Sequence, residues 1–228
     1  GTVRLVTDPT YLAWNYTLRS SDGHIANHLE ADDVGWHAGN WYMNMHSIGL
    51  EHEGWAGSAG WFTEAMYQTS AELVAYLADR YDVPVDRAHI IGHDQVPGIL
   101  PGYTKNVHWD PGPYWDWDHY MELVGAPAGG GLTPTADVHE GDVVEVVAGY
   151  DANPVTGCEV ASPGSEPCVE GAGTNFVLAY QEPSLDAPYA RDPGWKPGGA
   201  DGTTYASDLS ARVTSGHKFV VEEVRGDW

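Results

Sequence analysis

The sequence predicts an α/β domain followed by a small all-β, barrel-like module. In residues 1–125, short extended runs surround one long amphipathic helix. Residues 126–137, APAGGGLTPTAD, contain three successive glycines and two prolines without apolar periodicity, which is typical of a linker. Residues 138–228 contain β-rich runs divided by Gly and Pro clusters, with no convincing helix. We therefore predict an N-terminal domain at 1–125, a linker at 126–137 and an all-β module at 138–228.

The first elements of the N-terminal domain have the pattern of a β-hairpin. Residues 11–18 (YLAWNYTL) and 24–30 (HIANHLE) are short extended runs, and the turn-forming cluster RSSDG at 19–23 separates them. A second extended run, HSIGLEHEG, occupies residues 46–54. Side chains alternate between the two faces of a strand. One face of this run would carry Ser47, Gly49, Glu51 and Glu53, and the other would carry Ile48, Leu50 and His52. Two carboxylates thus share a face with a glycine that leaves space.

Residues 63–81 are predicted to form the main helix of the domain. Thr63 is placed to cap its N-terminus, and one helical stripe carries the apolar side chains Met66, Leu73, Val74, Leu77 and Tyr81. Residues 88–93 (AHIIGH) are predicted to form a buried strand that ends at His93. Residues 114–124 (YWDWDHYMELV) are predicted to form a closing helix.

The C-terminal module contains three β-rich runs, at 141–150, 174–183 and 217–228. The last run reaches a turn signal at Arg225-Gly226-Asp227, just before the final residue. A hairpin at that turn needs a return strand, so we expect the module to be truncated at its end.

Charge and hydropathy restrict the partners of the protein. The formal net charge is −23, from 33 acidic and 10 basic residues, which argues against nucleic acid or an anionic membrane surface as a partner. The acidic excess is even along the chain, with 17 acids and 5 bases in residues 1–125 and 16 and 5 in residues 126–228. No run of 18 apolar residues and no signal-peptide pattern is present, so neither a membrane span nor a leader is predicted.

Two cysteines suggest the compartment. Cys158 and Cys168 lie in GCEVASPGSEPC, where Gly and Pro make a loop able to bring them together. A disulfide between them fits a secreted protein. The alternative is a pair of free thiols in a cytosolic protein, since two cysteines are weak evidence by spacing alone.

A rigid acidic loop is the first candidate for chemistry. In NVHWDPGPYWDW, residues 106–117, Pro111 and Pro113 restrict the backbone and place Asp110 in a loop rather than in a helix. Asp110 is therefore a candidate ligand. The alternative reading is that Asp110 caps the helix predicted at 114–124.

Three motifs in order carry a family resemblance. WHAGNWYMNMHSIGLEHEG, IIGHDQVPG and HWDPGPYWDW, with a helix between the first and the second, resemble the type-2 N-acetylmuramoyl-L-alanine amidases, zinc enzymes related to peptidoglycan recognition proteins. The resemblance covers about residues 1–124. It implies a mixed β-sheet flanked by helices and hydrolysis of the amide between N-acetylmuramic acid and L-alanine in peptidoglycan. The β module is similar to the wall-binding domains often appended to such enzymes.

The resemblance also assigns residues. His93 and Asp110 match zinc ligands, and Glu51 matches the catalytic carboxylate. His108 occupies the position where relatives place a Lys or His that stabilises the transition state. His37 and Asn44 match residues that line the same cleft, although either also suits a turn.

One zinc ligand of the family has no match in the chain. The first histidine ligand of relatives lies on a core strand upstream of the stretch that resembles GTVRLVTDP, where this chain begins. Asn15 does not replace it, because AWNY matches the following strand, whose His or Asn is not a ligand. We expect that an upstream segment or another chain supplies this strand, and that residues 1–228 alone bind zinc weakly and show little activity.

The sequence therefore predicts a secreted, extracellular, zinc-dependent amidase that acts on the cell wall. Two alternatives remain open at this point. One is a non-catalytic peptidoglycan-binding module that keeps the cleft and lacks the metal, and the other is a structural or assembly protein that reuses the fold. Zinc content separates the enzyme from both alternatives, and binding to purified cell walls separates the alternatives from each other.

Overall fold

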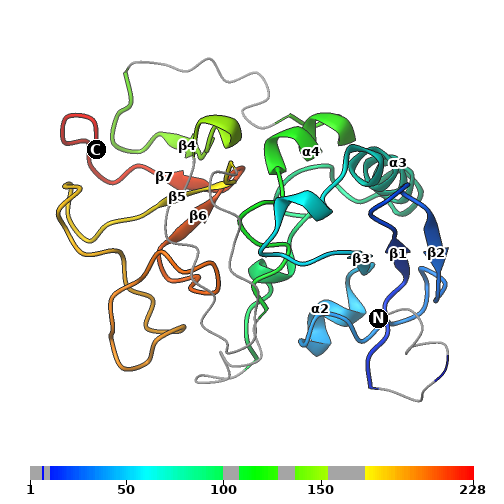
Figure 1. Ribbon diagram of the computed structural model, residues 1–228. Coiled ribbons are helices and arrows are strands. Elements are labelled where there is room, and N and C mark those ends of the chain that lie inside the picture. The colour runs from blue at the N-terminus through cyan, green and yellow to red at the C-terminus, as the bar shows by residue number, and fades with distance from the viewer. Residues whose placement is uncertain (1–6, 8–10, 100–107, 128–136, 154–172) are drawn as a thin grey trace.

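The structure of the protein is a computed structural model that describes residue 7 and residues 11–99, 108–127, 137–153 and 173–228 (Figure 1). Figure 1 shows the first three strands and the longest helix on one side of the molecule and the last four strands on the other. The predicted linker is described only at its two ends. Cys158 and Cys168 lie outside the described residues.

The N-terminal half contains a mixed three-stranded sheet with the order β2-β1-β3. Its strands are β1 (Tyr16–Leu18), β2 (Ile25–Asn27) and β3 (Leu50–His52). Strands β1 and β2 pair antiparallel as the predicted hairpin, while β3 runs parallel to β1. Gly23 closes the hairpin turn with a φ of 69°, a conformation that favours glycine. The predictions of a hairpin and of a mixed sheet are confirmed.

Two predicted helices are confirmed, with shorter bounds for the second. The main helix is α3 (Glu64–Tyr81), and the Thr63 side chain accepts the backbone N–H of Met66 as its N-cap. The closing helix is α4 (Trp117–Val124), which begins later than predicted because Asp116 is its N-cap. Shorter helices are α2 (Trp41–Met45) and the 3-10 turns η1 (Ala59–Trp61), η2 (His93–Gln95) and η4 (Tyr150–Ala152).

The strand predicted at residues 88–93 is wrong. The backbone N–H groups of His89 and Ile90 both donate to the carbonyl of Asp86, which closes a turn. The Asp86 side chain also accepts the backbone N–H groups of Ala88 and His89, so a local side-chain cap competes with extended structure. His93 therefore begins η2 instead of ending a strand.

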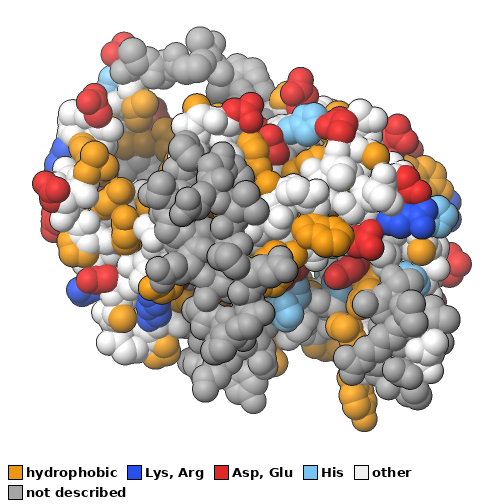
Figure 2. All heavy atoms as spheres, in the orientation of Figure 1, with side chains coloured by type: hydrophobic (Ala, Val, Ile, Leu, Met, Phe, Trp, Pro, Cys, Tyr) orange, Lys and Arg blue, Asp and Glu red, His pale blue; other side chains and the backbone are white. Residues whose placement is uncertain are grey.

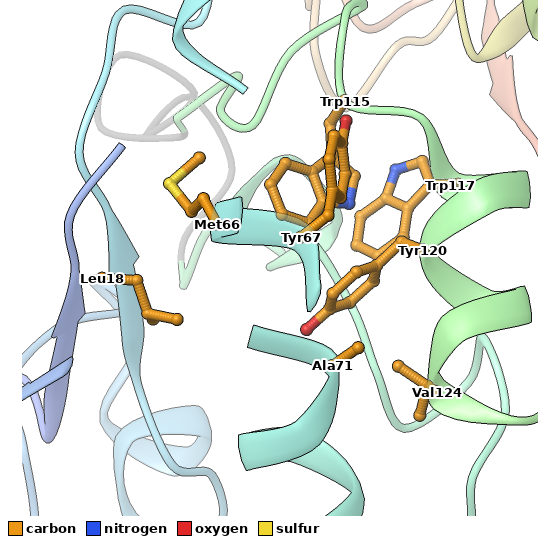
Figure 3. Close-up of a cluster of buried hydrophobic side chains, with 8 residues drawn as sticks. All are labelled: Leu18, Met66, Tyr67, Ala71, Trp115, Trp117, Tyr120 and Val124. Atoms are coloured by element: carbon orange, nitrogen blue, oxygen red, sulfur yellow. The ribbon is translucent and has the colours of Figure 1, made fainter. Parts of the chain in front are cut away.

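The core lies between the sheet, α3 and α4 (Figure 3). Leu18 of β1 and Met66 of α3 are fully buried, and Trp115, at 2% exposure, packs among aromatic rings from both helices. Its ring centroid lies 4.4 Å from that of Tyr67 and 4.8 Å from that of Tyr120. The buried cluster comprises Leu18, Met66, Tyr67, Ala71, Trp115, Trp117, Tyr120 and Val124. This core holds β3 and the start of α4 in one rigid unit.

A chain of polar side chains crosses the core beside Trp115. His52 Nε2 and Ser70 Oγ share a hydrogen bond of 2.7 Å, and Ser70 Oγ shares another of 2.7 Å with the Tyr120 hydroxyl. Burial lowers the pKa of His52 to about 4, so the imidazole is neutral at pH 7.

The neutral state of His52 predicts acid sensitivity. Because the unfolded chain binds the proton near the ordinary histidine pKa and the folded chain only near pH 4, the free energy of unfolding falls as the pH falls between these values. His52→Gln keeps a hydrogen-bonding side chain but does not titrate. Between about pH 7 and about pH 4, we expect the free energy of unfolding of this variant to fall by up to about 3 kcal/mol less than that of the unsubstituted protein. Urea unfolding of both proteins from about pH 7 to about pH 4 measures it, and parallel curves for the two would contradict the assignment.

The C-terminal half consists of short strand pairs. Strand β4 (Val143–Glu145) pairs antiparallel with β7 (Lys218–Val220), and β5 (Phe176–Leu178) pairs antiparallel with β6 (Arg212–Thr214). The predicted β-rich runs contain β4, β5 and β7, whereas β6 was not predicted. The described residues form two separate pairs, so the barrel-like closure predicted for this region is not observed among them.

The surface agrees with the even spread of acidic residues. Figure 2 shows acidic side chains scattered over both halves of the face in view. Among the described residues, no helix has the length and apolar character needed to cross a membrane.

Candidate metal centre

Strand β3 presents Glu51 on the face opposite the core. Leu50 packs against the buried cluster and His52 contacts Trp115, with ring centroids 4.8 Å apart, so strand alternation points Glu51 away from them. The entry to β3 is fixed by Asn15, which is fully buried and whose Oδ1 accepts the backbone N–H of Gly49 at 2.9 Å. The predicted alternation is confirmed for Leu50, Glu51 and His52, although the strand is shorter than the run predicted at 46–54. Asn15 has a structural role.

The other site residues lie on two loops, and a backbone hydrogen bond links these loops. His93 begins η2, and Asp110 lies in a loop that ends before α4. The backbone N–H of Asp94 donates to the carbonyl of Asp110 at 2.9 Å. Because Asp116 caps α4, the alternative reading of Asp110 as a helix cap is wrong.

His93, His108 and Asp110 form a compact cluster of donor atoms. His93 Nδ1 lies 3.4 Å from Asp110 Oδ2, and His108 Nδ1 lies 3.4 Å from Asp110 Oδ1. The two imidazole rings stack with centroids 4.2 Å apart and an angle of 7° between planes. One ligand atom from each residue lies within 4.8 Å of the others. The sequence predicted His93 and Asp110 as ligands, and the structure adds His108 as a third donor beside them.

This donor set fits a zinc ion. Imidazole nitrogens and a carboxylate oxygen are common zinc ligands, and a catalytic zinc site usually takes three protein ligands. Ligand atoms around a tetrahedral zinc ion are about 3.4 Å apart, which follows from bond lengths of about 2.0–2.2 Å. The two distances to Asp110 already have this value. These distances run to different oxygens of Asp110, so the three side chains suit the ion by donor type and proximity.

Neighbouring side chains shift the pKa values of Asp110, His108 and Glu51. Burial alone would raise the pKa of Asp110, but hydrogen bonds from His108 and His93 outweigh it and hold that pKa below its usual range. The hydrogen bond to Asp110 raises the pKa of His108. Partial burial raises the pKa of Glu51, and the negative charge of Asp110 adds to the effect. Asp110 is thus an anion, and Glu51 is shifted toward the range of a general base.

His37 and Asn44 lie next to the β3 face of the site. Burial lowers the pKa of His37, and the charge of His93 lowers it further. The His37 ring lies over Gly49, where an added Cβ would come within 2.6 Å of His37 Cγ. Asn44 is 7% exposed, and its Oδ1 accepts the backbone N–H groups of His37 and Ala38. Asn44 therefore holds the turn that carries His37, and the roles of both toward a ligand remain predictions.

Sequence reasoning missed two residues that join the loops, Gly92 and Asp94. A Cβ on Gly92 would lie 2.3 Å from Asp94 Oδ1 and 2.6 Å from Pro111 Cδ. The absence of a side chain thus lets the two loops approach. The Gly-His pair in IIGHDQVPG was the available signal, but a sequence does not show what lies opposite a glycine.

Comparison with known proteins identifies the family and two relatives. Residues 3–113 match the family described as N-acetylmuramoyl-L-alanine amidase. The N-acetylmuramoyl-L-alanine amidase A of Achromobacter lyticus is 31% identical over 136 residues, which cover 53% of this chain and 71% of that protein. The 1,6-anhydro-N-acetylmuramyl-L-alanine amidase AmpD of Salmonella typhimurium is 33% identical over 115 residues, covering 48% of this chain and 56% of that protein. No solved structure shows a significant match.

The matched region contains the whole candidate site. Glu51, His93, His108 and Asp110 all fall within residues 3–113, and the predicted resemblance rested on the motifs that carry them. The β-rich half lies beyond the match. The chain belongs to the N-acetylmuramoyl-L-alanine amidase family.

Proposed function

We propose that this protein is a zinc-dependent peptidoglycan hydrolase that cleaves the amide between N-acetylmuramic acid and L-alanine. The observation that carries the proposal is the cluster of His93, His108 and Asp110, whose donor atoms lie within 4.8 Å of one another near Glu51. The names of the two relatives support the bond and the substrate.

His93 and Asp110 would hold the zinc ion, with His108 beside them. When bound, zinc supplies Lewis acidity that polarises the amide carbonyl and makes a water molecule acidic enough to attack near neutral pH. Asp110 is suited to this role because its carboxylate is ionised and its two oxygens lie 3.4 Å from His93 Nδ1 and His108 Nδ1.

Glu51 is suited to move the proton. Its carboxylate takes a proton from the attacking water, whose oxygen bonds to the amide carbon, and returns a proton to the nitrogen as the C–N bond breaks. The products are the muramyl carboxylate and the free amine of L-alanine. His108, whose pKa is raised, is suited to donate a hydrogen bond to the oxygen that gains negative charge in the transition state.

Peptide release and metal content test the proposal together. Purified peptidoglycan is incubated with the protein, and new L-alanine amino termini are counted before and after treatment with a chelator. The expected result, for a chain extended by the predicted upstream strand, is hydrolysis that the chelator removes and zinc restores. Residues 1–228 alone should show much less hydrolysis and bind much less zinc. A protein that binds peptidoglycan without hydrolysis and without zinc is instead a binding module of the amidase family.

Action on the wall outside the cytoplasm is part of the proposal, and the cysteines test it. In an oxidising compartment Cys158 and Cys168 form a disulfide across their Gly- and Pro-rich segment. Thiol titration of the unreduced, denatured protein should find no free thiol, and reduction should expose two. Two free thiols before reduction would contradict both the bridge and the secreted location.

A further inference from the structure

An ion pair joins the C-terminal β region to the residue that follows His93. Arg212 Nη2, on the first residue of β6, lies 3.1 Å from Asp94 Oδ2, and the two side chains are 3% and 5% exposed. Arg212 also donates to the carbonyl of Ala206, and its guanidinium lies 5.0 Å from the ring centroid of Phe176. Separating a buried pair leaves each charge without a partner, so this contact strongly restrains the position of Asp94.

Asp94 passes this restraint to the second loop. Its side chain binds Arg212 while its backbone N–H donates to the carbonyl of Asp110 at 2.9 Å. Asp94 therefore lies between Arg212 on one side and both predicted ligand segments on the other. A displacement of Asp94 would move His93 through the chain and Asp110 through the hydrogen bond.

Asn175 holds the loop that follows Asp110. It is 1% exposed, and its Nδ2 donates to the carbonyls of Gly112 at 3.0 Å and Trp115 at 2.6 Å. Its backbone N–H donates to the carbonyl of Pro113 at 3.0 Å. Asn175, which immediately precedes β5, thus donates hydrogen bonds to three backbone carbonyls of the segment between Asp110 and α4. Buried carbonyls need such partners, and the loop conformation depends on this one.

A third contact fixes the end of η2. Gln95 Oε1 accepts Arg87 Nη2 at 2.7 Å, and Gln95 Nε2 lies 2.6 Å from His217 Nε2. Arg87 Nε donates to the carbonyl of Ser215 at 3.2 Å, and its guanidinium lies 3.5 Å from the ring centroid of Trp117. The β region therefore contacts η2 at both Asp94 and Gln95.

We propose that the C-terminal β region positions the metal centre, with Arg212 and Asn175 as positioning residues for His93 and Asp110. The inference rests on the proposed function only in assigning those two residues to zinc. A preorganised set of ligands binds a metal more tightly than a loose one, and outer partners of ligands commonly change metal affinity by about 10–100-fold. The β region would thus form part of the unit that holds the metal.

Zinc affinity of single variants tests this role. Competition with a chromophoric chelator is measured for the unsubstituted protein and for Arg212→Met, Arg212→Lys and Asn175→Ala. We expect Arg212→Met and Asn175→Ala each to weaken zinc binding by at least about tenfold. Arg212→Lys keeps the charge and loses the planar fork, so it should recover part of the affinity. The visible spectrum of the Co²⁺-loaded proteins should change in the same order.

The matched control is Arg191→Met, because Arg191 forms an exposed ion pair with Asp201 at 2.6 Å in the same β region. It should leave zinc affinity and the Co²⁺ spectrum unchanged. Hydrogen exchange of the metal-free proteins gives an independent measure, since the Asp94 amide should exchange faster in Arg212→Met and Asn175→Ala. If Arg212→Met does not fold, Arg212→Lys and Asn175→Ala decide the question.

The outcomes separate this inference from the proposed function. Folded variants that bind zinc as tightly as the unsubstituted protein overturn the inference and leave the proposed function intact. An unsubstituted protein that binds zinc but releases no peptide overturns the proposed function, while the change in zinc affinity still decides the inference. If a chain extended by the predicted upstream strand also binds no zinc, both are overturned.

Discussion

Glu51→Gln is expected to abolish hydrolysis and leave the metal bound. The amide of Gln has the size of the carboxylate but does not take a proton, so the rate of peptide release should fall by about 10²–10⁴-fold. Zinc content should stay the same, because the residues proposed to hold the ion are His93 and Asp110 and not Glu51. Peptide release from purified peptidoglycan and elemental analysis of the same sample measure the two effects.

Two further variants make the result specific. Glu53→Gln changes a carboxylate two residues along the same chain segment, where Glu53 Oε2 accepts the backbone N–H of Ser20, and should keep near-normal activity. His93→Ala should lose both zinc and hydrolysis, since it removes a proposed ligand. Near-normal hydrolysis by Glu51→Gln would remove Glu51 from the catalytic role.

Gly92→Ala is expected to have the second largest effect, because it separates the two ligand loops. The backbone at Gly92 has a φ of −83°, which any residue adopts, so the substitution acts through space rather than conformation. Its Cβ would lie 2.3 Å from Asp94 Oδ1 and 2.6 Å from Pro111 Cδ. Arg212 restrains Asp94, so relief must come from movement of the loops. Zinc affinity should fall by at least about tenfold.

The control for Gly92 is Gly60→Ala. The nearest atom to an added Cβ there is Ser58 Oγ at 4.0 Å, which is ordinary contact. Gly60→Ala should keep the zinc affinity of the unsubstituted protein, and thermal unfolding of both variants shows whether each is folded. A folded Gly92→Ala protein with unchanged zinc affinity would contradict the close approach of the loops as the reason for the glycine.

Local patterns predicted most of the N-terminal half. The turn cluster between two extended runs, the Thr63 cap and the alternation that turns Glu51 away from the core are short-range features, and each is confirmed. The prediction failed at residues 88–93, where an apolar run suggested a strand. There the Asp86 cap determines the structure, because a side chain that satisfies nearby N–H groups stabilises a turn.

The sequence by itself determined the family and proposed the residues that would carry its chemistry. Glu51, His93 and Asp110 stand in the motifs that carry the resemblance, and all three lie within the region that matches the family. Only the tertiary structure decided how these residues are held. Arg212 and Asp94 are 118 positions apart, and no local periodicity or cap relates them. Their pairing depends on how β6 packs against the η2 loop, so the contact appears only when the whole chain is folded.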